Sequence, residues 1–224
     1  MTVALRMPSS SATHVPPAMA VKRPRRRPRK TAGERDEGNR RRQLVTAAAR
    51  LFRRKGFGAT TTRDIAAAVG MHAGSPFYHF KSKEALLHAV MQEGMRVALE
   101  RQTAVPISTA DPVNALRNLI RNHFGVLLGP GSDFIPVMLY EWRSLNARQR
   151  ASVNRLQATY EAAWVPVLRA LVAAGRMRTD VHLARLLIFG ALNWSVQWYS
   201  AGKAATLDDL TDAAISLFIH PEPA

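Results

Sequence analysis

The chain has 224 residues, of which 47% are hydrophobic, enough for about one or two domains with a sizeable core. It contains no cysteine, which excludes disulfide bonds and cysteine catalysis and favours a cytoplasmic location. The net charge of +16 is uneven, because residues 1–83 hold 19 Lys/Arg against 4 Asp/Glu and residues 84–224 hold 13 against 12. A basic first third on a nearly neutral remainder indicates a polyanion-binding end.

The first predicted segment is a disordered basic arm over residues 1–38. It is rich in Pro, Ser and Arg, and its few large apolar residues cannot offset the entropy of ordering. Residues 22–30, KRPRRRPRK, place seven cations in nine positions. We interpret them as an arm along DNA phosphates or in a minor groove; a solubilising tail or a misassigned start codon is the alternative.

No membrane association is expected. Residues 1–21 lack the continuous apolar run of a signal peptide. Residues 183–198 are the most apolar later stretch, and they are too short and too polar to span a bilayer.

Residues 39–86 form the second predicted segment, a DNA-binding domain of short helices. Apolar residues at helical spacing predict a first helix over residues 37–55, with cations on its other side. Gly56 ends this helix, because glycine reaches the left-handed conformation without steric cost.

A helix-turn-helix motif is predicted to follow over about residues 61–80. Thr61 and Asp64 have the spacing of a capping box, which starts a second short helix that ends at Gly70. A third helix is predicted over residues 73–80, and in such a motif it enters the major groove of DNA.

Three sequence blocks carry a family resemblance: GFGATTTRDIA, then GSPFYHF, then KSKEAL. Their order and spacing resemble the DNA-binding domain of TetR-family transcriptional regulators, from about Leu44 to Val90 without a gap. Pro76 and Phe77 stand where the family usually has an apolar residue and a tyrosine. The phosphate contact of that tyrosine therefore passes to Tyr78 or is absent.

Helix starts and the resemblance together imply which residues contact DNA. His72 belongs to this set, although a small capping serine is common at its position in the family. Core packing is the alternative for Phe77, and a helix-end hydrogen bond is the alternative for His79. The predicted contacts are Arg42, Thr61, Arg63, His72, Ala73, Gly74, Ser75, Phe77, Tyr78, His79 and Lys83.

Residues 87–224 are predicted to form a helical ligand-binding and dimerisation domain. No alternating strand pattern appears, so the fold class is all-α: a three-helix helix-turn-helix domain followed by a helical bundle. Pro166 is expected to kink the longest helix. The predicted helices cover residues 83–103, 112–128, 134–145, 147–174, 181–201 and 207–219.

The last two predicted helices are strongly apolar, which fits either buried core or a subunit interface. In the resembled family these helices form a four-helix dimer interface. A homodimer would also place two reading helices on a palindromic operator in double-stranded DNA.

Aromatic residues gather in the second half, where helical aromatics belong more often to a core than to a pocket. The pieces YEWRSL and GALNWSVQWYSAGK resemble the ligand-binding domain of a TetR subgroup that includes repressors of fatty-acid and steroid breakdown, whose effectors are acyl-coenzyme A thioesters. Arg143 would pair with a phosphate of the effector; the alternative is a salt bridge with Glu141 or with an acid on the next helix. The implied pocket residues are Phe124, Met138, Trp142, Arg143, Tyr160, Trp164, Asn193, Trp194 and Gln197.

Two other classes of function fit the sequence less well. Seven histidines show no metal-ligand spacing, and nucleophile and phosphate-loop motifs are missing, which argues against an enzyme, a metal site or a cofactor. A nonspecific architectural binder would need the arm, so removing residues 1–38 would abolish its binding. The favoured hypothesis is a ligand-responsive repressor, with an acyl-coenzyme A or similar lipid-derived effector, that keeps its specificity without the arm.

Overall fold

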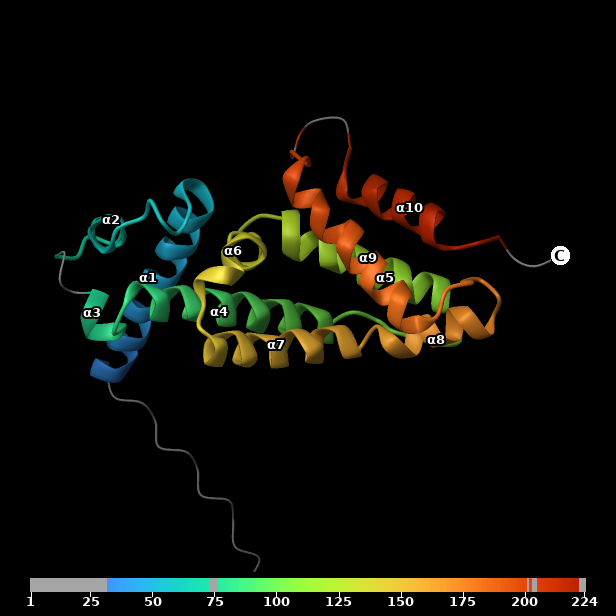
Figure 1. The fold of residues 1–224 in the computed structure, drawn as a ribbon, viewed down its shortest axis with the longest axis horizontal. Coiled ribbons are helices and arrows are strands. Elements are labelled where there is room, and N and C mark those ends of the chain that lie inside the picture. Colours follow the sequence, from blue (N-terminus) through green and yellow to red (C-terminus); the bar gives the residue numbers. More distant parts are fainter. Residues whose placement is uncertain (1–31, 73–75, 201, 203–204, 222–224) are drawn as a thin grey trace, which may run out of the picture.

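The computed structural model describes residues 32–72, 76–200, 202 and 205–221, and within these ranges the regular structure is entirely helical (Figure 1). This confirms the predicted all-α fold. The elements are α1 (Ala32–Lys55), α2 (Thr62–Ala68), α3 (Pro76–His79), α4 (Lys83–Thr103), α5 (Pro112–Leu128), α6 (Phe134–Glu141), η1 (Trp142–Ser144), α7 (Ala147–Ala162), α8 (Val165–Ala173), α9 (Val181–Trp194), η2 (Ser195–Gln197) and α10 (Leu207–Phe218).

Side-chain caps determine where several helices begin. The amide of Asp64 donates to Thr61 Oγ1 at 3.1 Å, and the amide of Thr61 donates to Asp64 Oδ2 at 2.9 Å. These bonds confirm the predicted capping box and hold the pKa of Asp64 below its usual range. Asn146 and Thr206 cap α7 and α10 in the same reciprocal way. Such a cap typically stabilises a helix by about 1 kcal/mol.

Several helices differ from their predicted bounds. The helices predicted over residues 134–145 and 181–201 end at Glu141 and Trp194, where the chain tightens into η1 and η2. The first helix begins at Ala32, five residues before the predicted start at residue 37. The predicted helix over residues 147–174 is interrupted between Ala162 and Val165, where a kink was expected. Pro166 explains the interruption, because proline has no N–H to donate and its ring clashes with the carbonyl four residues earlier.

The helices form an elongated molecule with α1–α3 at one end (Figure 1). Helix α4 leads from that end into the larger body, and it packs against α1, α6 and α7. Helix α5 packs against α8, α9 and α10. Buried apolar side chains from both regions form one core cluster. Within the ranges described above, each helix is too short or too polar to cross a membrane.

Gly94 sets the approach of α4 to α6. A Cβ at this position would lie 2.8 Å from Phe134 Cβ and 3.2 Å from Ile135 Cδ1. Gly94→Ala is therefore expected to lower the free energy of unfolding by about 1–3 kcal/mol, measured by urea denaturation. Gly38→Ala is the matched control, since nothing lies within 4 Å of a Cβ there. It should raise stability by up to about 1 kcal/mol. If both variants raised the free energy of unfolding equally, α4 and α6 would be shown to move apart around the added methyl group without loss of stability.

Candidate DNA and effector sites

Helices α1–α3 and the start of α4 form one unit, called here the reading head. Tyr78 on α3 is 94% exposed, so its ring contributes nothing to the core and is available to a partner. His79 is half-buried beside it. Ala73, Gly74 and Ser75 lie outside the described residues, as does the side chain of Phe77. Their predicted contacts with DNA stay predictions.

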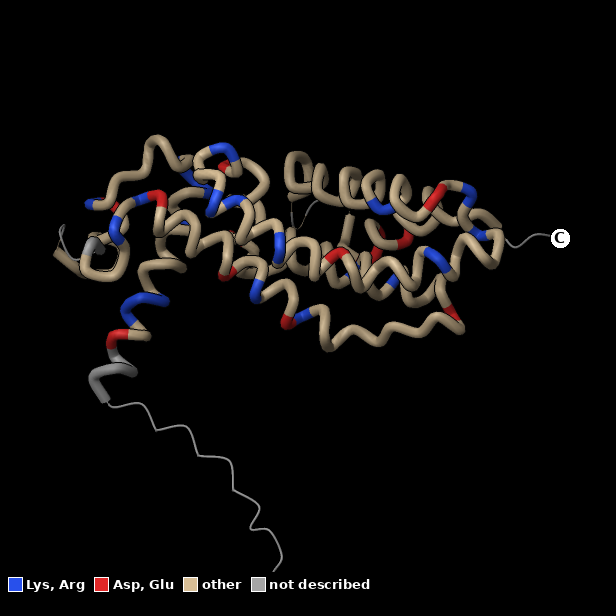
Figure 2. The backbone as a smooth tube through the Cα atoms, turned by 60° about the horizontal axis from the view of Figure 1, so that its bottom comes forward, with Lys and Arg blue, Asp and Glu red and all other residues tan. Residues whose placement is uncertain are grey.

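The outer surface of the reading head is basic. Arg42, Arg63 and His72 are exposed, as is Thr61 at the start of α2. Figure 2 shows Lys and Arg gathered on α1 and the head, whereas both signs of charge are interspersed over the larger body. The exposed residues predicted to contact phosphates therefore lie at the same end of the molecule as α3.

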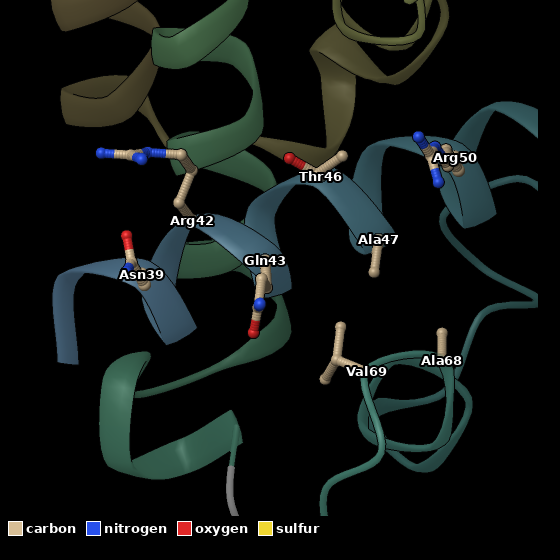
Figure 3. Close-up of a pocket in the computed structure, with 8 residues that line it drawn as sticks. All are labelled: Asn39, Arg42, Gln43, Thr46, Ala47, Arg50, Ala68 and Val69. Carbon is tan, nitrogen blue, oxygen red and sulfur yellow. The ribbon is translucent and has the colours of Figure 1, made fainter. Parts of the chain in front are cut away.

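A groove of about 650 Å³ separates α1 from the end of α2 (Figure 3). Gln43 and Ala47 on α1 point across it toward Val69. Guanidinium and amide groups of this kind position a protein on DNA phosphates without reading bases. The lining residues are Asn39, Arg42, Gln43, Thr46, Ala47, Arg50, Ala68 and Val69.

Lys83 has a structural role inside the head. Its Nζ donates to the carbonyls of Phe57 and Thr60 at 2.8 and 2.9 Å, and lies 4.3 Å from the centre of the Phe57 ring. These contacts join the start of α4 to the connection between α1 and α2. Because the ammonium already has two protein acceptors, the phosphate contact predicted for Lys83 stays a prediction.

Two carboxylates join the head to α6. The amide of Phe57 donates to Glu141 Oε1 at 2.9 Å. Arg53 donates to Asp133 Oδ1 at 3.2 Å and to the carbonyl of Ser132 at 3.3 Å. Sequence reasoning considered Glu141 only as a partner of Arg143, whose side chain is exposed. No local pattern could have shown these contacts, because their partners lie about 80 residues apart.

The larger body contains a polar cluster of Gln102, His123, Tyr160 and Trp164, which are buried, and Asn193, which is half-buried. It is called the buried polar cluster below. Trp164 Nε1 donates to Gln102 Oε1 at 3.0 Å, and Gln102 Nε2 donates to the carbonyl of Tyr160 at 2.8 Å. His123 Nδ1 lies 3.1 Å from the Tyr160 hydroxyl, and His123 Nε2 lies 3.1 Å from Asn193 Oδ1. The ring of Phe189 covers the cluster, 4.7 Å from that of Trp164.

Burial fixes the protonation of this cluster. It lowers the pKa of His123 to about 4, so the imidazole is neutral at pH 7. A neutral imidazole has one donor and one acceptor nitrogen. Nε2 faces a carbonyl oxygen and must carry the hydrogen, so Nδ1 accepts from the Tyr160 hydroxyl. Burial also raises the pKa of Tyr160, which keeps that hydroxyl protonated.

The structure separates the residues predicted to bind an effector. Tyr160, Trp164 and Asn193 meet around His123. Phe124 and Met138 are buried core residues, and Trp142 packs partly buried against the core. Arg143, Trp194 and Gln197 are exposed. Their roles in effector binding stay predictions.

Sequence reasoning missed His123 and Gln102. The signal for His123 was its place on the apolar face of α5, three residues after Ile120 and four before Leu127, both of which are fully buried. A histidine at such a position needs buried hydrogen-bond partners.

A helix-turn-helix head joined to a larger helical body defines the class of helical DNA-binding regulators. Residues 44–90 match the family model described as bacterial regulatory proteins, tetR family. Residues 109–221 match the tetracyclin repressor-like C-terminal domain. The chain therefore belongs to the TetR family of transcriptional regulators, and it is not an enzyme.

Several known proteins are similar over most of their length. HTH-type transcriptional repressor KstR2 of Rhodococcus jostii (strain RHA1) is 28% identical over 186 residues, covering 82% of this chain and 91% of that protein. The crystal structure of superantigen PfiT is 38% identical, with a TM-score of 0.67 over 80% of this chain and 95% of that one. The crystal structure of AibR in complex with isovaleryl coenzyme A and operator DNA shares the fold, with 24% identity and a TM-score of 0.71 over 80% and 97% of the two chains.

Tyr78 provides a direct test of the DNA surface. Tyr78→Ala is expected to weaken operator binding by about 10-fold to 100-fold, because a hydrogen bond to a charged group contributes about 1.5–3 kcal/mol. Fluorescence anisotropy with labelled operator measures the change. Stability should stay within about 0.5 kcal/mol, because the side chain is 94% exposed. Tyr140→Ala is the control, an exposed tyrosine on α6. Unchanged affinity in Tyr78→Ala would remove Tyr78 from the interface.

Proposed function

We propose that the protein is a ligand-responsive repressor that binds a near-palindromic operator as a homodimer. A lipid-derived acyl-coenzyme A releases it from the operator. The observation that carries the proposal is the exposed Tyr78 on a basic head, joined through α6 to a body with a buried polar cluster.

Exposed apolar side chains on α9 support the homodimer. Leu183, Leu187 and Trp194 follow one another at helical spacing and are 51%, 63% and 64% exposed. Leu217 on α10 is 81% exposed. Exposed apolar side chains gathered on the last two helices favour an interaction site there. A two-fold axis through this surface would present two reading heads to the two halves of a palindrome.

The effector class rests on the chemistry of the body. The polar cluster places hydrogen-bonding groups among aromatic rings, which is the composition of a small-molecule site. AibR, which shares the fold, binds isovaleryl coenzyme A. An acyl thioester would place its apolar chain among such rings and its carbonyl near a donor.

The proposed release is a population shift between two spacings of the reading heads. An effector can shift this equilibrium only if it binds the two spacings with different affinity. Helix α6 is the natural connection, because it contacts α4 within the body and α1 in the head. A displacement of α6 around a bound effector would move the head relative to its partner in the dimer.

Fluorescence anisotropy with DNA from upstream of the gene tests the proposal, with a scrambled duplex as competitor, at two salt concentrations, with and without isovaleryl coenzyme A. Specific binding typically exceeds nonspecific binding by about 1000-fold or more, and nonspecific binding falls steeply with salt. The expected result is that the protein prefers the upstream duplex to the scrambled one and that isovaleryl coenzyme A releases it from the upstream duplex. The same preference without release by the thioester would support a repressor and reject the proposed effector class. Equal binding to both duplexes and to every member of a random pool would favour an architectural binder.

The basic arm separates the same alternatives. Because α1 begins at Ala32, removal of residues 1–31 leaves the helix whole. The repressor should keep its preference for the operator and lose mainly affinity, whereas an architectural binder would lose binding altogether. Residues 1–31 of the predicted arm lie outside the described residues, so the effect of removing them stays a prediction. Residues 32–38, which were expected to be disordered, belong to α1.

A further inference from the structure

A second polar depression lies on the larger body, away from the reading head. It is a cleft of about 390 Å³ between the end of α4, the connection that follows it, and α5. Its polar lining consists of Arg101, Asn118, Arg121 and Asn122, and its lining includes no carboxylate. The term cationic cleft refers to these four residues below.

The arginine side chains of the cationic cleft have N–H donors that are not used within the described part of the protein. Arg101 gives one N–H to the carbonyl of Gly125 at 3.1 Å, and Asn118 Nδ2 donates to the carbonyl of Pro106 at 3.3 Å. Arg121 uses its Nε for Asp208 on α10, an exposed carboxylate outside the lining. The side-chain Nδ2 of Asn122 is buried without a hydrogen bond of good geometry among the described residues, but the Asn122 side chain lies close enough to the Tyr160 hydroxyl to oppose the rise in the pKa of that group. A guanidinium has five N–H donors, so both arginines keep donors for a ligand.

The cleft lies directly beside the buried polar cluster. On α4, Arg101 lines the cleft and the next residue, Gln102, belongs to the cluster. On α5, Asn122 lines the cleft and the next residue, His123, belongs to the cluster. One pair of helices thus carries cations at its surface and polar groups among aromatic rings in its interior.

We propose that the cationic cleft binds the phosphate groups of the effector, whose acyl end lies toward the buried polar cluster. The inference rests on the proposed function and deepens it, because it requires the effector to carry a phosphorylated head. Guanidinium groups match phosphate oxygens in geometry as well as charge, which suits Arg101 and Arg121 to this role.

Isothermal titration calorimetry on the full chain tests the site with three probes: isovaleryl coenzyme A, adenosine 3′,5′-bisphosphate and isovaleryl pantetheine, which has no phosphate. The double variant Arg101→Gln, Arg121→Gln is expected to bind the first two probes about 10-fold or more weakly than the wild type. Its affinity for isovaleryl pantetheine should be unchanged. Arg101→Gln alone should show a smaller loss of the same kind.

Two controls isolate the cleft from charge and from the contact with α10. The variant Arg155→Gln, Arg178→Gln removes two exposed arginines outside the cleft, so it changes the net charge equally. Asp208→Asn breaks the ion pair of Arg121 and leaves both cleft arginines in place. Both controls should bind the bisphosphate at least as well as the wild type.

The outcomes separate this inference from the proposed function. Equal binding of the bisphosphate by the wild type and the double variant, or no binding by the wild type, would overturn the phosphate site. If isovaleryl coenzyme A still releases the protein from the operator in that case, the proposed effector is supported although the phosphate site is rejected. A third outcome is that the bisphosphate binds in an arginine-dependent way but the thioester does not release the protein from the operator. This outcome would support the phosphate site and reject the acyl effector.

Discussion

Trp164→Ala is expected to lower the free energy of unfolding by about 3–5 kcal/mol, the usual cost of truncating a buried tryptophan. The Trp164 side chain is fully buried, and its Nε1 donates to Gln102 Oε1 at 3.0 Å. Alanine would leave a large cavity and also a buried acceptor without its donor, which adds a desolvation cost. Urea denaturation, followed by circular dichroism, measures the loss.

A loss of this size would show that Trp164 is packed as core in the ligand-free chain, so an effector that reaches the polar cluster would have to displace the rings around it. A residue that lines an open effector cavity should cost little stability when truncated and much effector affinity. Tyr140→Ala is the control, because Tyr140 is 50% exposed and should change stability by less than about 1 kcal/mol. Similar stabilities for the two variants would contradict the close packing around Trp164.

Acidification should destabilise the protein through His123, by up to about 3 kcal/mol between pH 6.5 and pH 4. Burial lowers the pKa of His123 to about 4 in the folded chain, against about 6.5 when unfolded. In this window the unfolded chain binds the extra proton and the folded chain does not. The contribution of His123 to stability therefore rises with pH from about 4 to 6.5 and is constant at higher pH.

Comparison with His123→Phe isolates the contribution of His123. The variant should be less stable at pH 7, because Tyr160 and Asn193 lose their partner. The difference between its unfolding free energies at pH 7.5 and 4.5 should nevertheless be smaller than that of the wild type. Carboxylates such as Asp64 and Glu93, whose pKa values are also lowered, affect both proteins alike. Identical pH profiles would show that His123 is not buried in its neutral form.

The sequence predicted local features well because their causes are local. Asp111 and Pro112 lie where α5 begins, and Ser82 lies directly before α4, so both helices have their predicted starts. Capping depends on residues three or four apart, which a sequence displays directly. The break at Trp164 was predicted only as a kink, because the severity of a proline's effect depends on the packing around it.

The candidate sites were predictable to different degrees. A helix-turn-helix head presents its side chains by local geometry, and the exposure of Tyr78 agrees with its predicted position. The buried polar cluster instead joins four helices through residues up to 91 positions apart in sequence, from Gln102 to Asn193. Only the packed structure brings them together, so the sequence pointed to Tyr160, Trp164 and Asn193 and left out His123.

The attachment of the reading head to α6 has a mechanical consequence. The Phe57 amide bonds to Glu141, at the end of α6, and Arg53 bonds to Asp133, at its beginning. Helix α4 is a further attachment, because it runs from the head into the body and packs against α1. The head is therefore fastened along the whole length of α6 as well as along α4, so a shift of α6 in the body would be transmitted to the head at both ends of that helix at once.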